Sequence, residues 1–208
     1  MDHAHTTREL RSLRAVLKEW VRLNRLLGRQ WSNNGGDLPW WYNERALLSV
    51  LVGAVWREGG HAFEEFAELK HRGKQKRLGN GRVDLWFETS GGEFRAEAKY
   101  AEIPITNKAQ QLRSLHELMR LAVKDAGRNP ADGGDSRRLA VAFAVPYLRA
   151  GLSEEKREAQ INWFLSLVED VDHDALAWVF PSLKKLPVYN DWVCPGIVLW
   201  IKQVKRSP

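Results

Sequence analysis

The stretch GRVDLWFETSGGEFRAEAKY, residues 81–100, most constrains the fold because it predicts two β-strands joined by a tight turn at SGG. Side chains along a strand point alternately to opposite faces. One face of this hairpin is apolar and is formed by Val83, Leu85, Phe87, Phe94, Ala96, Ala98 and Tyr100. Asp84 lies on the other face of the first strand, and Glu97 and Lys99 share the polar face of the second. The hairpin can therefore bring two carboxylates and an ammonium together.

The totals describe a single globular domain. The chain has 208 residues, of which 44% are hydrophobic and 28% charged, and this length is enough for one full core. No apolar run approaches the roughly 18 residues that cross a bilayer. The first residues lack the pattern of a signal peptide. We therefore expect a cytoplasmic protein without a membrane partner.

Charge and cysteine content narrow the partners and the sites. The net charge of +6 favours a polyanionic partner. The single Cys194 excludes an internal disulfide and a multi-cysteine zinc site.

Before the hairpin, the pattern predicts two helices and a strand. Thr6 or Thr7 caps a first helix over 6–27, which is added to the core and whose basic face either lies along nucleic acid or is a solvated surface. A loop over 28–39 precedes a second helix over 39–57, with Glu44 in its first two turns. Residues 63–71 predict a strand.

After the hairpin, helices and strands alternate. The predicted elements are a helix over 106–124 capped by Thr106, a loop over 128–136, a strand over 138–147, a helix over 153–169 and strands over 175–180 and 197–204. This order predicts an α/β fold with a central mixed sheet flanked by helices. Residues 39–145 form the predicted core, and residues 146–208 complete the sheet.

The polar face of the hairpin suits phosphodiester hydrolysis. This reaction needs an activated water and neutralisation of the charge that grows on the phosphate oxygens. Mg²⁺ prefers hard oxygen ligands, and one or two carboxylates with a phosphate oxygen can hold it. Asp84 and Glu97 supply such carboxylates, and Lys99 adds a positive charge beside them.

The set Glu44, Asp84 and Glu97-Ala98-Lys99 resembles the PD-(D/E)XK nuclease superfamily, which has the restriction-endonuclease-like fold. The resemblance covers about residues 39–145. It implies a Mg²⁺-dependent enzyme, with Mn²⁺ as a substitute, in which Asp84, Glu97 and the Ala98 carbonyl bind metal and Lys99 is catalytic. Glu44 would order a metal-bound water or help with a second ion. Val83 stands where the family has its proline, which has no ligand role.

For other polar residues near the motif, the sequence leaves alternative roles open. Gln110 or Gln111 matches an accessory glutamine that some members of the family carry on the next helix. The loop RGKQKRLGNGR contains Arg72, Lys74, Lys76, Arg77 and Arg82, which would meet phosphates or form a solvated hairpin tip. Glu64 and Glu65 either join the site or pair with basic side chains.

The sequence favours a DNA endonuclease, which could act as a homodimer or as part of a larger complex. The alternative is a non-catalytic nucleic-acid-binding or structural subunit of a DNA-processing or defence complex with the same fold. A different hydrolase is disfavoured, since the histidines show no metal-ligand spacing and no glycine-rich phosphate loop or serine elbow is present.

Overall fold

The computed structural model describes the chain apart from residues 35–36, 73–76, 106–107, 130–135, 182–185 and 206–208, and apart from the side chains of residues 34, 68–72, 77–80 and 108. Its strands are β1 (Asp2–Thr6), β2 (His61–Arg72), β3 (Arg77–Thr89), β4 (Gly92–Pro104), β5 (Arg137–Arg149), β6 (Ala175–Val179), β7 (Trp192–Val193) and β8 (Ile197–Gln203). Its α-helices are α1 (Arg14–Asn34), α2 (Glu44–Arg57), α3 (Lys108–Ala126) and α4 (Glu154–Val168), with short 3₁₀ turns η1 (Arg11–Leu13) and η2 (Pro39–Trp41).

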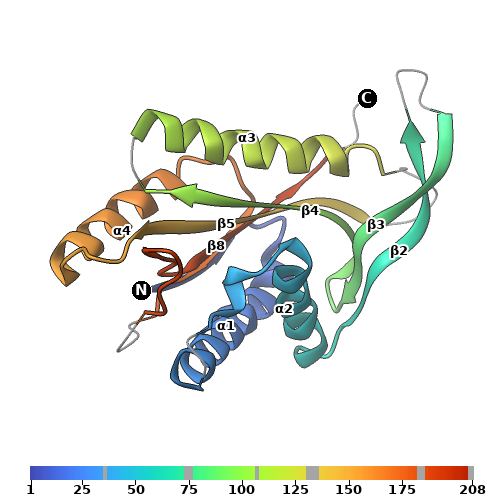
Figure 1. Cartoon of the computed structure of the whole chain (residues 1–208). Helices are drawn as coiled ribbons and strands as arrows, with labels where there is room; N and C mark the ends of the chain where they lie inside the picture. The colour runs from blue at the N-terminus through green and yellow to red at the C-terminus, as the bar shows by residue number, and fades with distance from the viewer. Residues whose placement is uncertain (35–36, 73–76, 106–107, 130–135, 182–185, 206–208) are drawn as a thin grey trace.

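The strands form one mixed sheet in the order β1-β6-β8-β5-β4-β3-β2, with β7 paired to β5. Strands β2, β3 and β4 are an antiparallel meander, and β5 is parallel to β4 after the crossover through α3. Helices α1 and α2 cover one face of the sheet, and α3 and α4 cover the other (Figure 1). The predicted mixed sheet with flanking helices is confirmed.

Strand β5 shows why a continuous apolar run belongs at the centre. Its alternate side chains pack in two cores: Leu139, Val141 and Phe143 beneath α1 and α2, and Ala140, Ala142 and Ala144 beneath α3 and α4. Because both faces are covered, no position along LAVAFAV meets water. The small residues all face α3 and α4, which leaves room for the large side chains Trp200 and Phe164 in that core.

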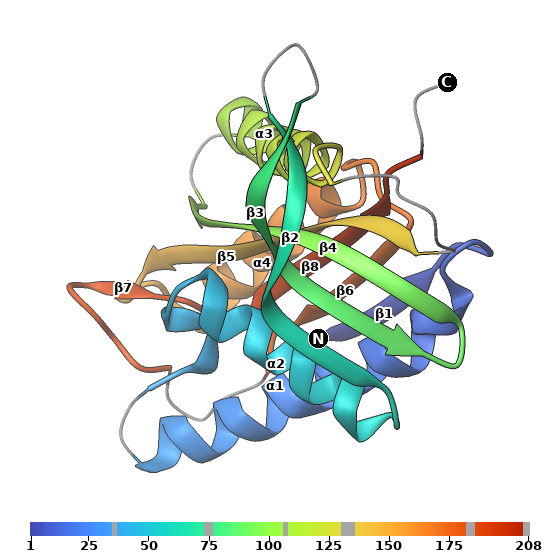
Figure 2. The ribbon, with the colours of Figure 1, turned by 90° about the vertical axis from the view of Figure 1, so that its right-hand side faces the viewer.

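The sheet divides at β3 and β4. Their pairing runs from Thr89↔Gly92 to Leu85↔Ala96 and then ends. Pairing of β2 with β3 continues to Arg72↔Arg77, whereas β4 follows β5 to Pro104↔Tyr147. The β2–β3 hairpin therefore leaves the sheet, as Figure 2 shows. We call the point of separation, at Asp84 and Glu97, the fork.

The predicted first helix over 6–27 is wrong at both ends. Thr6 closes strand β1, which pairs with β6, and α1 begins only at Arg14. The polar sequence DHAHT carries no apolar alternation, so only pairing with β6 makes it a strand. The helix also continues through Gly28 to Asn34. A Cβ at residue 28 would lie 2.9 Å from the ring of Trp40, so the close packing of Trp40 requires glycine at this position. Gly28 thus serves packing and does not end the helix.

Helix α2 begins at Glu44 and not at residue 39. Residues 39–41 form η2, and the Asn43 side chain caps α2 by accepting from Ala46 N at 3.2 Å. The other predicted elements are confirmed within a few residues, while β1 and β7 were missed. Thr106 and most of the predicted loop over 128–136 lie outside the described residues. None of the described helices is long and apolar enough to span a membrane.

Candidate active site

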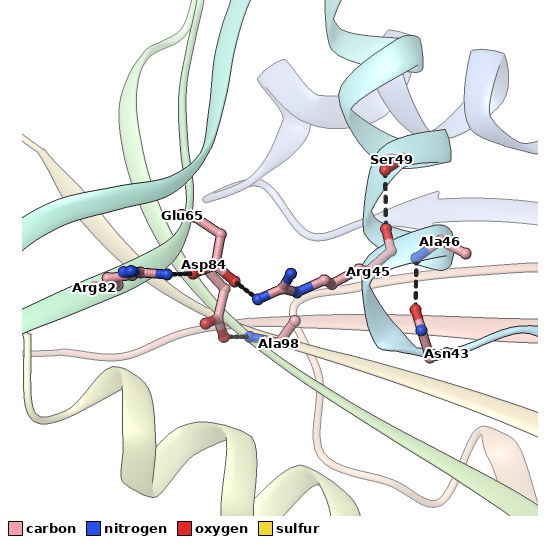
Figure 3. Close-up of polar contacts among 8 residues, drawn as sticks. All are labelled: Asn43, Arg45, Ala46, Ser49, Glu65, Arg82, Asp84 and Ala98. Carbon is pink, nitrogen blue, oxygen red and sulfur yellow. Dashed lines mark hydrogen bonds and ion pairs between the residues drawn. The ribbon is translucent and has the colours of Figure 1, made fainter.

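Two carboxylates lie at the edge of β4 that the fork exposes. Asp84 Oδ2 accepts a hydrogen bond from Ala98 N at 2.8 Å (Figure 3). The backbone N–H of Tyr100, two residues further along the same edge, lies near enough to the Glu44 carboxylate to favour its ionised form and so lower its pKa. The Asp84 carboxylate replaces a ladder hydrogen bond that is lost where β3 departs, so the Ala98 donor does not remain unpaired. The fork therefore fixes Asp84 and Glu44 on either side of Lys99.

Glu97 and Lys99 share the face of β4 beneath α3. Their neighbours Ala96 and Ala98 are buried in the core beneath α1 and α2, so the pleat turns residues 97 and 99 the other way. The register that pairs Leu85 with Ala96 would next place Asp84 opposite Glu97. Glu97 is only 4% exposed and has polar contacts of its own. The predicted sharing of one face by these side chains agrees with the fold.

Lys99 is held by two oxygen acceptors. Its Nζ lies 2.9 Å from the Ala98 carbonyl oxygen and 2.9 Å from Asp125 Oδ2. Asp125 lies in the last turn of α3 and also accepts from Arg128 Nη1 at 2.9 Å. Asp125 was not among the site residues predicted from the sequence. Its signal was an acid at a helix C-terminus, where the helix dipole disfavours negative charge unless a cation lies nearby.

The pKa of Glu44 is raised from its ordinary value, chiefly by burial. The Lys99 ammonium and the Tyr100 N–H oppose this shift, while the carboxylates of Asp84 and Asp125 add to it. Glu44 is thus a carboxyl group that holds a proton more readily than an exposed glutamate does. A raised pKa brings a carboxylate closer to the range in which it accepts and releases protons near neutral pH.

The pKa of Lys99 is also raised. Burial by itself lowers the pKa of this ammonium, but the hydrogen bond and charge of Asp125 act in the other direction, together with the charges of Glu44 and Asp84. Lys99 is therefore a fixed positive charge at neutral pH. This suits stabilisation of an anionic transition state and not proton abstraction.

The oxygen donors at the fork have the chemistry that a hard cation needs. The described carboxylates near the fork are those of Glu44, Asp84, Glu97 and Asp125, and the described cations beside them include Lys99 and Arg128. Among the described residues, no group of three or more His, Cys, Asp and Glu side chains is arranged to hold a metal ion. The expected ligand set does not require one, because it has two carboxylates and the Ala98 carbonyl. Carboxylate and carbonyl oxygens are the donor types that Mg²⁺ prefers, although here the Ala98 carbonyl accepts from the Lys99 ammonium.

A second cluster, on the β2 side of the fork, involves Glu65. Its carboxylate accepts from Arg45 of α2 at 2.8 Å and from Arg82 of β3 at 3.0 Å (Figure 3). Glu65 has a φ of 54°, a left-handed conformation that side-chain-bearing residues seldom adopt. The contact ties the hairpin to the start of α2, one residue after Glu44. Glu64 instead accepts from Ser49 Oγ at 2.9 Å.

The expected phosphate-binding residues are only partly described. Arg82 is exposed and pairs with Glu65, which is the pairing alternative predicted for Glu65. Arg72 and Arg77 lie in strands without described side chains, and Lys74 and Lys76 lie outside the described residues.

The two accessory glutamines point to different environments. Gln111 is 1% exposed, and its Nε2 donates to the Pro104 carbonyl at the end of β4. Gln110 lies on the exposed side of α3 and has its own partners. No described contact joins either side chain to Lys99, Asp84 or Glu44.

Comparisons with protein-family models, with curated proteins and with solved structures find no match to this chain.

Proposed function

We propose that this protein is a metal-dependent nuclease that hydrolyses phosphodiester bonds, with DNA as the favoured substrate. The observation that carries the proposal is the convergence of Glu44 and Asp84 on the β4 edge around a Lys99 ammonium whose pKa is raised. An isolated sheet face would present these charges to solvent. Here α2, β3 and β4 bring Glu44, Asp84 and Lys99 near enough to interact electrostatically, and Glu44 and Lys99 are partly buried.

The order of elements also supports the proposal. Helix α2, the antiparallel β2, β3 and β4, the crossover α3 and the parallel β5 follow one another. The restriction-endonuclease-like core that the motif resembles is proposed on this order and on the position of the motif residues. Asp84 and Glu97 would occupy adjacent strands of that core, with Lys99 further along β4.

The residues of the fork divide the work of hydrolysis. Asp84, Glu97 and the Ala98 carbonyl would hold Mg²⁺ or Mn²⁺, which supplies charge neutralisation and a more acidic water. Lys99 stabilises the additional negative charge as the new phosphorus–oxygen bond forms and the old one breaks. Glu44 accepts the proton of the attacking water, which its raised pKa favours. Asp125 is a positioning residue, because it holds the Lys99 ammonium.

A non-catalytic nucleic-acid-binding or structural subunit is the second candidate. The observation in its favour is that Asp84, Glu44 and Lys99 all have partners within the fold. In that case the carboxylates serve only to satisfy the free edge of β4.

Incubation of the purified chain with plasmid, linear duplex, single-stranded DNA and RNA, in Mg²⁺ or Mn²⁺, tests the proposal. Glu97→Gln and Lys99→Met should each reduce cleavage by roughly 100-fold or more. Lys202→Met is the matched control, since Lys202 is also a strand lysine, 26% exposed against 28% for Lys99, and pairs with Asp172.

No cleavage of any substrate would overturn the proposal, as would full cleavage by folded Lys99→Met protein. Calorimetric titration with Mg²⁺ distinguishes the non-catalytic subunit from a metal-dependent nuclease. A structural fork gives no binding heat that disappears in Asp84→Asn, whereas a metal site does.

A further inference from the structure

A pocket of about 580 Å³ lies where the segment before α2 meets the ends of β4 and β5, and we call it the aromatic pocket. Its lining residues are Asp37, Trp41, Tyr42, Glu102, Tyr147, Tyr189, Asn190, Trp192 and Cys194. The volume lies within the range of small-molecule sites, roughly 300–1,000 Å³. Five of these side chains are aromatic and two are carboxylates, while no lysine or arginine is among the described lining residues.

One wall of the pocket is a tight turn that holds two of the rings. Tyr189 and Trp192 exchange backbone hydrogen bonds, N to O, of 2.9 Å in both directions. The two residues between them, Asn190 and Asp191, have φ values of 47° and 67°, as a type I′ turn requires. Strand β7 pairs with the end of β5, so the turn is fixed against the sheet (Figure 2). Tyr147 packs edge-on against Trp192, with ring centroids 5.0 Å apart.

The opposite wall comes from the segment that leads into α2. Trp41 faces Tyr189 across the pocket, with ring centroids 6.3 Å apart and planes inclined by 55°. Tyr42 donates its hydroxyl proton to Asp37. Trp40 Nε1 donates to the Cys194 carbonyl at 2.9 Å, which ties this wall to the segment after β7. The residues Tyr42 and Tyr189 remain 48% and 68% exposed to solvent. Large aromatic area at this opening is therefore accessible to a ligand.

The aromatic pocket and the proposed active site share two elements. Tyr42 lies two residues before Glu44, and Glu102 lies three residues after Lys99 on β4. Three residues of strand span about 10 Å. Tyr100 connects the two sites, since its backbone N–H lies near the Glu44 carboxylate and its hydroxyl donates to Glu102 at 2.8 Å. Because side chains alternate along β4, Glu102 lies on the opposite face from Lys99, so a nucleic-acid strand with a phosphate at Lys99 reaches the pocket only by passing over the edge of β4 that β3 leaves free.

We propose that the aromatic pocket receives an unpaired nucleobase of the strand that the fork cleaves, and prefers guanine to thymine. Aromatic faces stack on any base. Carboxylates accept hydrogen bonds from amino and imino groups, and guanine carries two adjacent donors of this kind on its pairing edge. No lysine or arginine is among the described lining residues, and Arg149 lies over the Trp192 ring at 4.1 Å from its centroid, so the proposal assigns only the base, and not its phosphate, to the pocket. The inference rests on the proposed nuclease function for the position of that phosphate.

Binding of single-stranded oligonucleotides in EDTA tests the pocket without any cleavage. The probes are a fluorescein-labelled dT12, the same strand with one central guanine, and the same strand with one central abasic site, followed by anisotropy. The guanine strand should bind most tightly. Tyr189→Ala and Trp41→Ala should each weaken its binding roughly tenfold and remove the difference between the probes, as expected when a base loses an aromatic stacking partner. Trp56→Ala is the matched control, because Trp56 is 49% exposed on α2 and lies outside the pocket.

The outcomes separate the pocket from the active site. Unchanged binding in folded Tyr189→Ala and Trp41→Ala proteins overturns the pocket proposal, even if the wild type cleaves DNA. Loss of guanine preference in these variants supports it, even if nothing is cleaved and the nuclease proposal falls. Displacement of the guanine strand by tetramethylammonium and not by guanosine monophosphate, at equal ionic strength, would also overturn it. That result would assign the rings and carboxylates to an organic cation.

Discussion

The ammonium of Lys99 lies 2.9 Å from the carboxylate of Asp125, and this contact joins the last turn of α3 to the centre of β4. The two residues are 28% and 25% exposed, so water screens their attraction only in part. The contact explains how an acid is tolerated at the end of a helix. It also explains why the pKa of Lys99 is raised although burial acts to lower it.

Removal of the Asp125 charge should lower the pKa of Lys99. In Asp125→Asn the burial of the ammonium remains, but the strongest group that raises its pKa is lost. NMR titration of the Lys99 side chain measures the shift, and cleavage should decline because the ammonium is no longer held. Asp172→Asn, which removes the partner of Lys202, is the control and should leave Lys99 unchanged. An unaltered Lys99 titration in Asp125→Asn would contradict the assigned contact.

Two substitutions at Asp84 should show separately its effect on stability and its effect on cleavage. The amide oxygen of Asp84→Asn can still accept from Ala98 N, so the free energy of unfolding should change by less than about 1 kcal/mol. Asp84→Ala leaves that donor unpaired and should cost about 1–3 kcal/mol. Both variants should lose cleavage, as urea unfolding and the plasmid assay will measure.

Asp174→Asn is the control for Asp84, because Asp174 accepts from Gln203 N at the same distance of 2.8 Å. It should resemble Asp84→Asn in stability and retain cleavage. Wild-type cleavage by Asp84→Asn would mean that the carboxylate only closes the edge of β4.

Glu44→Gln should stabilise the protein at neutral pH and impair cleavage. The pKa of Glu44 is raised in the folded state, so folding favours the protonated form. The stability that this proton contributes is complete below the ordinary glutamate pKa of about 4.3 and is lost as pH rises through the folded value. Thermal unfolding at several pH values should show an advantage for the variant that shrinks on acidification. A less stable variant at neutral pH would show that contacts of the ionised form prevail.

Gln111 should act on stability and not on catalysis. Its buried amide donates to the Pro104 carbonyl, so Gln111→Ala should cost about 1–3 kcal/mol of unfolding free energy. Gln110→Ala, on the exposed side of α3, should stay within about 0.5 kcal/mol. Chemical unfolding and cleavage per folded molecule give the two readouts. A large loss of cleavage in folded Gln111→Ala would instead assign it the accessory role that the family resemblance implies.

Local patterns were sufficient for most of the fold. The hairpin over 81–100, the buried strand around LAVAFAV and the helix that Ser153 caps all follow from periodicity and turn chemistry. The misplaced first helix had a different cause. The segment DHAHT is a strand because it pairs with β6. Gly28 lies within the helix because its missing side chain makes room for Trp40, and this tertiary contact is not visible in the local sequence.

The sequence by itself determined that Asp84, Glu97 and Lys99 share one face, because strand geometry fixes the direction of alternate side chains. Only the tertiary structure decided that β3 leaves β4 at Asp84, that Asp125 reaches Lys99, and that the turn at Tyr189 faces Trp41. These contacts join segments far apart in the chain, and their formation depends on how the helices pack on the sheet. No local pattern of residues carries that information.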